Sequence, residues 1–308
     1  MVEPDPSSVR HPGHWQHLDV RGNGIRLHVA ECGPTSPDAP LVVLLHGFAQ
    51  YWWSWRHQLV ALGEAGYRTV AVDLRGYGDS DKPPRGYDGW TLSGDISGLI
   101  RGLGHDEATL IGHADGGLIC WAGAALHPKH VTAIATIAAP HPLGLRRATF
   151  RDAPQRAALA PAMVRNQIPR LAEHRLATDN GAGVEALLKS RAGGAWTQTE
   201  DFSDTVHNDR SAIQIAGAAH CALEYHRWAF RSQFRPDGAR FREALHPTIR
   251  KPVLELRGAD DPYVLPGTFS RCTEWAPDRR LATFSTGHFV HQEAPDDVTA
   301  SLLGFLRR

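Results

Sequence analysis

Residues 108–127 read ATLIGHADGGLICWAGAALH, a pattern that predicts a strand, a sharp turn and a helix. Residues 108–111 form a short run of residues that favour a β-strand, and residues 118–127 suit a buried helix. Gly112 and Gly116 lie two residues on either side of Ala114, where a turn of this sharpness tolerates only small side chains. Such turns present a catalytic side chain, and serine, cysteine or aspartate normally occupies the centre. Because a methyl group occupies it here, the turn lacks an attacking atom.

Patterns of strand and helix alternate along the rest of the chain. Residues 24–30 alternate apolar and polar side chains, as a half-exposed strand does, whereas residues 41–45 are continuously apolar, as in a strand covered on both faces. Repeated strand–helix units predict a mostly parallel sheet with right-handed crossovers and helices on both faces. Further strands are expected at residues 69–73, 131–137, 252–256 and 280–284, and further helices at 51–66, 92–103 and 294–306.

This alternation stops at residue 143. Residues 143–245 are rich in Ala, Leu and Arg, look helical and contain no clear strand. We therefore predict an α/β core made of residues 1–142 and 246–308, interrupted by a helical cap, or lid, at 143–245. A cap in that place would lie over the carboxyl ends of the strands, where open α/β sheets bind their ligands.

Composition excludes several other classes of protein. The 308 residues carry 33 Lys and Arg against 33 Asp and Glu, a balance that argues against nucleic acid as the main partner. The longest apolar run, residues 41–45, is far too short to span a bilayer, and the polar first dozen residues are expected to form a loose tail without a secretory signal. Four scattered cysteines without a CxxC pair favour a cytoplasmic protein with free thiols. A monomer and a homodimer both remain open.

Three further segments carry chemistry. His46-Gly47-Phe48 follows a buried strand, and the backbone N–H groups of Phe48 and Asp115 are expected to converge on a developing negative oxygen. Asp260 and Asp261 follow the strand at 252–256, and the three-residue spacing from Gly258 favours Asp261 as the functional carboxylate. His288 follows the strand at 280–284, on a loop that can meet this carboxylate. The order turn, acid, histidine is that of α/β-hydrolases.

These motifs resemble those of an α/β-hydrolase of the epoxide hydrolase family, nearest to the epoxide hydrolase E type of mycobacteria and other actinobacteria. The resemblance covers nearly the whole chain, and its most specific stretches are residues 46–58, 73–83, 112–117 and 287–295. It implies that Asp261 is the charge-relay acid and that His288 is the base. In that family the central aspartate of the turn attacks an epoxide carbon to form an ester, which activated water then cleaves.

The chain departs from this family at several positions. Ala114 replaces the nucleophile, and Ala49 stands where proline is usual. The two tyrosines that donate hydrogen bonds to the epoxide oxygen align with Ala162 and His226, and Tyr225 is the neighbour of the second. Since nucleophile and both donors change together, we interpret the substitutions as natural divergence.

Each candidate also has a structural explanation. Asp115 becomes the nucleophile if the register of the turn shifts by one residue, or it simply caps the following helix. Trp53 and its neighbouring tryptophans form either a substrate wall or a packing cluster. The excess of Lys and Arg in residues 143–191 suits solvated helix faces or, alternatively, an anionic substrate tail. No cofactor or metal is expected, because the histidines at 11, 14 and 17 lie in a polar stretch without a second ligand group.

The predicted function has one main form and two alternatives. In the main form, His288 and Asp261 activate water that attacks an apolar epoxide or ester directly, in a pocket bounded by Phe48, Ala114, Asp115, Asp261 and His288. The first alternative is a ligand-binding protein that holds a lipid, epoxide or ester without turnover. The second is a hydrolase with Asp115 as shifted nucleophile.

Overall fold

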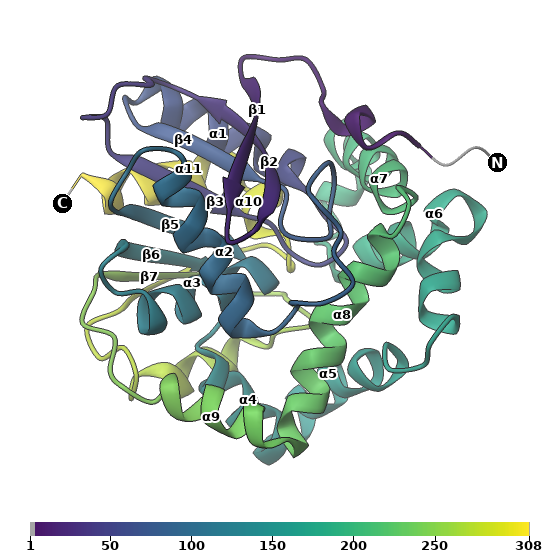
Figure 1. Ribbon diagram of the computed structural model, residues 1–308. Coiled ribbons are helices and arrows are strands. Elements are labelled where there is room, and N and C mark those ends of the chain that lie inside the picture. Colours follow the sequence, from purple (N-terminus) through teal and green to yellow (C-terminus); the bar gives the residue numbers. More distant parts are fainter. Residues whose placement is uncertain (1–3, 308) are drawn as a thin grey trace.

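The run of five apolar residues at 41–45 forms β3 (Leu41–Leu45), whose side chains are all buried. It lies inside an eight-stranded sheet of order β1-β2-β4-β3-β5-β6-β7-β8 in the computed structural model, which describes residues 4–307 (Figure 1). The β1–β2 and β2–β4 pairs are antiparallel and the other pairs are parallel. The other strands are β1 (Gln16–Gly22), β2 (Ile25–Cys32), β4 (Arg68–Val72), β5 (Ala108–His113), β6 (Val131–Ile137), β7 (Val253–Gly258) and β8 (Arg280–Phe284).

Helices cover both faces of the sheet. On one face α2 (Gly89–Gly102) and α3 (Asp115–Leu126) pack together, and on the other α1 (Arg56–Glu64) packs against α11 (Pro295–Leu306) (Figure 1). The predicted fold class is confirmed: a mostly parallel sheet between two helical layers, with the apolar core on both faces. Short elements complete the core: η1 (Pro6–Val9), η2 (Trp52–Trp55), η5 (Pro266–Cys272) and α10 (Val290–Glu293).

All the helices between β6 and β7 gather on one side of the sheet, in teal and green in Figure 1. They begin at Pro142 and end at Ala244, close to the predicted limits of 143 and 245. That these helices form a separate cap domain stays a prediction. Their bounds are α4 (Pro142–Arg151), α5 (Ala153–Arg165), α6 (Leu171–Arg191), η3 (Trp196–Gln198), α7 (Glu200–Ile213), α8 (Ala218–Arg231), η4 (Ser232–Phe234) and α9 (Pro236–Ala244).

The N-terminal segment is not the loose tail that the sequence predicts. This statement concerns residues from 4 onward, because residues 1–3 lie outside the described part of the chain. Val9 is buried, Arg10 Nε lies 2.6 Å from Asp79 Oδ2, and His11 Nε2 lies 2.6 Å from the Tyr51 hydroxyl. The segment is ordered because its polar side chains find partners that only the folded chain brings near. The following strand β1 was also not predicted, since its residues are mostly polar. It forms because it pairs with β2 through a tight turn at Asn23 and Gly24.

No helix within residues 4–307 is both long enough and apolar enough to cross a membrane.

Candidate functional site

The predicted turn lies between β5 and α3, with Ala114 at its apex. Strand β5 ends at His113, helix α3 begins at Asp115, and Ala114 between them has φ +47° and ψ −112°. A non-glycine residue rarely adopts a positive φ, and such strain is typical of functional turns. Both flanking glycines are required by space. A Cβ on Gly112 would lie 2.4 Å from the backbone of Gly116, and one on Gly116 would lie 2.2 Å from the carbonyl oxygen of Leu45.

We expect Gly116→Ala to lower the free energy of unfolding by about 3 kcal/mol, because the new methyl group meets rigid backbone in the core. Gly304→Ala is the matched control, since that glycine lies in α11 with open space around its Cβ position. The control should be neutral or slightly stabilising, as alanine is the better helix former. Urea unfolding of both variants measures the difference, and equal midpoints would contradict the close packing of the turn.

The loop after β3 packs directly against this turn. The carbonyl oxygen of His46 accepts the Gly116 N–H at 3.1 Å, and a Cβ on Gly47 would lie 3.2 Å from the Ala114 methyl carbon. The N–H of Phe48 donates to no acceptor within residues 4–307. The N–H of Asp115 has no partner in its own helix, because it is the first residue of α3. That these two N–H groups together bind a ligand oxygen stays a prediction.

Ala49, where the resemblance to epoxide hydrolases led us to expect proline, has φ +58°. Proline holds φ near −65°, so it does not fit the backbone of this chain at position 49.

His288 and Asp261 form a buried pair. The Nδ1 of His288 lies 2.8 Å from Asp261 Oδ2, and Asp261 Oδ1 accepts the N–H groups of Tyr263 and Val264 at 2.8 and 2.9 Å. With Nδ1 donating to the carboxylate, the free lone pair of His288 lies on Nε2. That nitrogen is buried and has no hydrogen-bond partner within residues 4–307. Asp260, in contrast, is exposed.

His113 links this pair to the turn. Its Nε2 lies 3.0 Å from the carbonyl oxygen of His288, the two ring centroids are 5.0 Å apart, and the side-chain amide of Gln50 lies 2.9 Å from Nδ1. Burial, followed by repulsion from His291 and His288, holds the pKa of His113 well below its ordinary value. A neutral ring donates only one hydrogen bond, so His113 Nε2–H holds the loop that carries His288 beside the turn.

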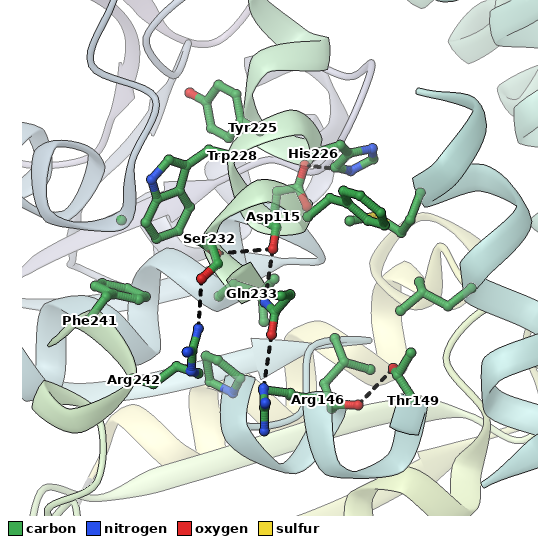
Figure 2. A pocket seen from close by; sticks show the side chains of 18 of the residues that line it. Asp115, Arg146, Thr149, Tyr225, His226, Trp228, Ser232, Gln233, Phe241 and Arg242 are labelled. Carbon is green, nitrogen blue, oxygen red and sulfur yellow. Dashed lines mark hydrogen bonds and ion pairs between the residues drawn. The ribbon is translucent and has the colours of Figure 1, made fainter. Parts of the chain in front are cut away.

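A second histidine–aspartate pair joins α8 to the start of α3. His226 Nε2 lies 3.3 Å from Asp115 Oδ2 (Figure 2), and the side-chain amide of Asn166 donates to His226 Nδ1 at 2.8 Å. The His226 ring also stacks on Phe48, with centroids 4.2 Å apart and planes 19° apart. With Nδ1 accepting from Asn166, the proton of His226 lies on Nε2 and faces the Asp115 carboxylate.

Asp115 is ionised in this setting. Burial by itself raises the pKa of the carboxyl group, but the electrostatic attraction and the hydrogen bond of His226, with smaller effects of Arg191 and His46, lower it below its ordinary value. The carboxylate therefore carries its negative charge at neutral pH.

A mostly apolar cavity begins at this second pair. Its volume is about 350 Å³, and Asp115, Tyr225 and His226 contribute to its wall (Figure 2). Of the five residues predicted to bound the pocket, only Asp115 lines this cavity. The other four do not: Phe48, Ala114, Asp261 and His288. The cavity extends instead from Asp115 along the apolar faces of α3, α4, α5, α8 and α9.

Comparison with known proteins agrees with this geometry. The profile of the alpha/beta hydrolase fold family matches residues 40–295. The chain belongs to this family. Epoxide hydrolase A of Mycobacterium tuberculosis is 31% identical, with 93% of this chain and 96% of that protein covered. The crystal structure of epoxide hydrolase A from Mycobacterium thermoresistibile is 30% identical and superimposes with a TM-score of 0.74, covering 95% of this chain and 98% of that one.

Similarity extends to other bacterial members of this hydrolase family. The crystal structure of a point mutant of an epoxide hydrolase from Bacillus megaterium is 27% identical and has a TM-score of 0.80, with 95% of this chain and 100% of that chain covered. The AB hydrolase superfamily protein YfhM of Bacillus subtilis is 30% identical, with coverage of 94% and 96%. This chain is thus an epoxide-hydrolase-like α/β-hydrolase, and its narrower resemblance to the E type stays a prediction.

Three other residues were predicted to face the pocket: Tyr225 does line the cavity, whereas Trp53 and Ala162 do not. Tyr225 donates its hydroxyl to the carbonyl oxygen of Arg75 at 2.7 Å and points away from Asp115 (Figure 2). Trp53 lies outside the cavity wall and packs edge-on against Trp15 and Trp52, which is the packing explanation. Ala162 is buried in α5 but does not line the cavity. The physical reason is that helix rotation and tertiary packing, which sequence spacing does not define, orient these side chains.

Sequence reasoning missed the residues that orient the candidate groups. Asn166 fixes the tautomer of His226, and Gln50 contacts His113. Neither belongs to a recognisable motif, because an amide at one position carries no signal of its distant partner.

Proposed function

We propose that this α/β-hydrolase hydrolyses an epoxide or ester by direct attack of water, with His288 as general base and Asp261 as the residue that orients it. One observation carries the proposal: the buried and unpartnered Nε2 of His288 is tied through His113 to a turn whose central residue is Ala114. A base is present, whereas the methyl group of Ala114 cannot form a bond to carbon. Water is then the nucleophile that remains for this base.

With an epoxide as substrate, His288 Nε2 takes a proton from water while the water oxygen bonds to one epoxide carbon. The bond from that carbon to the epoxide oxygen breaks at the same time. The negative charge that develops on the ring oxygen is stabilised by the N–H groups of Phe48 and Asp115. The proton held on His288 finally neutralises the alkoxide through solvent, which gives a diol.

The helical insertion at 143–245 serves in this proposal as a cap. Helix α8 supplies His226, which contacts both Phe48 of the oxyanion loop and Asp115 of the turn. A cap helix in this position excludes bulk water, but not the reacting water molecule, and so strengthens the electrostatic effect of the groups around the substrate.

A second candidate reaction uses Asp115 as nucleophile. The observation in its favour is that the Asp115 carboxylate lies in the cavity wall in its ionised form, beside a histidine. Its attack on an epoxide carbon would form an ester on the enzyme, and water would then have to cleave this ester.

Hydrolysis in water enriched in heavy oxygen distinguishes these reactions. We expect a panel of apolar epoxides and esters to give product labelled from the solvent in a single turnover, and His288→Ala to lose it. Label that appears first in a peptide containing Asp115, and only later in product, would support the second candidate. Tight binding with no product from any substrate would overturn both and identify a ligand-binding protein without turnover.

The Asp115–His226 contact predicts a dependence of stability on pH. Because the folded state lowers the pKa of Asp115, its stabilisation is present above the ordinary pKa of about 3.9 and is lost as the pH falls through the folded value. We expect Asp115→Asn to cost about 1 kcal/mol of unfolding free energy at pH 7, and less near pH 3. Urea unfolding at the two pH values measures this difference. Asp260→Asn, at an exposed position, should show no such change.

A further inference from the structure

Three arginines line the apolar cavity. They are Arg146 of α4, Arg156 of α5 and Arg242 of α9, and Figure 2 shows Arg146 and Arg242 at the end of the cavity opposite to Asp115 and His226. We call them the arginine rim. The cavity thus has a histidine–aspartate pair at one end, two arginines at the other end, and Arg156 as a third arginine in its wall.

None of the three rim arginines forms an ion pair within residues 4–307. Arg146 Nε donates to Gln233 Oε1 at 2.9 Å, Arg156 to the carbonyl oxygen of Phe150 at 3.1 Å, and Arg242 to that of Ser232 at 2.8 Å. These contacts orient the side chains without a carboxylate partner; Arg146 and Arg156 are exposed to solvent and Arg242 is half-buried. The neighbouring Arg147, which lies outside the cavity, pairs with Glu274 at 2.8 Å.

The rim charges also repel each other. Burial, followed by the positive charge of Arg146, lowers the pKa of Arg242. Two guanidinium groups that line one cavity and have no carboxylate partner favour the binding of an anion, which lowers their repulsion and uses their free donors.

Between the two ends the wall is apolar. Aliphatic and aromatic side chains of α3, α4, α5, α8 and α9 form it, and two of them at its edge, Phe150 and Phe234, are 54% and 75% exposed. Large apolar side chains exposed at the edge of a cavity mark a site that receives an apolar ligand. The lining residues include Leu118, Leu143, Leu159, Met163, Trp228 and Phe241.

We propose that this cavity binds an amphiphile, with an apolar chain along the wall and an anionic head group, a carboxylate or a phosphate, at the arginine rim. The far end of the chain then lies beside Asp115 and His226, where a reactive epoxide or ester would meet the catalytic groups. Only this last placement rests on the proposed function. Recognition of the head group depends on the rim alone.

Calorimetric titration with unreactive ligands below their micelle concentration tests the proposal. The probes are decanoate, decyl phosphate, decanol and decyltrimethylammonium, which share a chain and differ in head group. We expect decanoate or decyl phosphate to bind at least about tenfold more tightly than decanol, a preference that decreases with added salt. The better of the two anions identifies the head group. Equal affinity for decanol, or a preference for the cation, would overturn the proposal.

Variants of the rim separate this effect from general changes of charge. Arg146→Gln, alone and combined with Arg242→Gln, should bring the affinity for decanoate to that for decanol. Arg240→Gln removes an equal charge from an exposed position of α9 outside the cavity and should leave the preference unchanged. Unchanged thermal midpoints show that the variants fold, and a preference retained in the folded double variant would contradict the proposal.

Two controls separate the remaining alternatives. His288→Ala should bind decanoate as the unmodified protein does, so that a failure of catalysis leaves the binding result intact. Vesicles that contain anionic lipid test whether the rim instead contacts a membrane. If the rim variants abolish vesicle binding but leave the decanoate affinity unchanged, the amphiphile proposal is wrong.

Discussion

Replacing Ala114 with aspartate is expected to increase the rate of epoxide opening by about 100-fold or more, because a nucleophile held at the apex of the turn replaces a free water molecule. The turn is already formed: Ala114 has the strained backbone, and Gly112 and Gly116 provide the close approach that this conformation needs. His288 would then activate the water that cleaves the ester intermediate. The backbone of the turn therefore already has the conformation that we expect a nucleophile at position 114 to need.

Single-turnover kinetics with an apolar epoxide, followed by mass spectrometry of the intact protein, measures this gain. A covalent adduct should accumulate on Ala114→Asp and be absent from Ala114→Asn, which has nearly the same shape and no nucleophile. If Ala114→Asp folds and binds the epoxide but forms no adduct, the changes in the helical insertion, with His226 and Ala162 at the expected tyrosine positions, are the actual block.

Loss of the buried pair is the second large effect that we expect. His288→Ala and Asp261→Asn should each lower kcat by about 1,000-fold, within the range attributed to general acid–base catalysis. His288→Ala removes the base. Asp261→Asn keeps the shape but loses the charge that holds Nδ1–H of His288 and stabilises the protonated ring. The KM of both variants should change little, since neither residue lines the apolar cavity.

Steady-state hydrolysis of the best substrate of the panel checks this prediction. Asp260→Asn is the matched control, because it makes the same chemical change one residue away at an exposed site. Similar losses in Asp260→Asn and Asp261→Asn would exclude a specific role for Asp261. Full activity of His288→Ala would exclude general base catalysis by this imidazole and leave Asp115 as the candidate that acts on substrate.

Much of the core follows from local pattern. The strands at 41–45, 131–137 and 280–284 occur as predicted, because continuous or alternating apolar residues suit strands whatever their neighbours are. The turn at Ala114 also follows from local chemistry, since two glycines beside a small residue allow the close approach of strand and helix. Edge strand β1 was missed because its order comes from pairing with β2.

The candidate site was predictable only in part. The order of the motifs predicts contact between Asp261 and His288, because loops after neighbouring parallel strands meet at one edge of a sheet. In the structure the two side chains lie 2.8 Å apart. The contact of His226 with Asp115, the position of the cavity and the placement of Tyr225 were not predictable. Each depends on how the helices at 142–244 rotate and pack against the core.

Residue pattern was therefore sufficient for the sheet, the turn and the absence of a nucleophile at Ala114, because these properties depend on neighbours within a few positions. Tertiary structure alone brought Asp115 against His226 and placed three arginines around one cavity. Those contacts join segments far apart in the chain. Their geometry is set by packing and charge in the folded molecule, for which a linear pattern carries no signal.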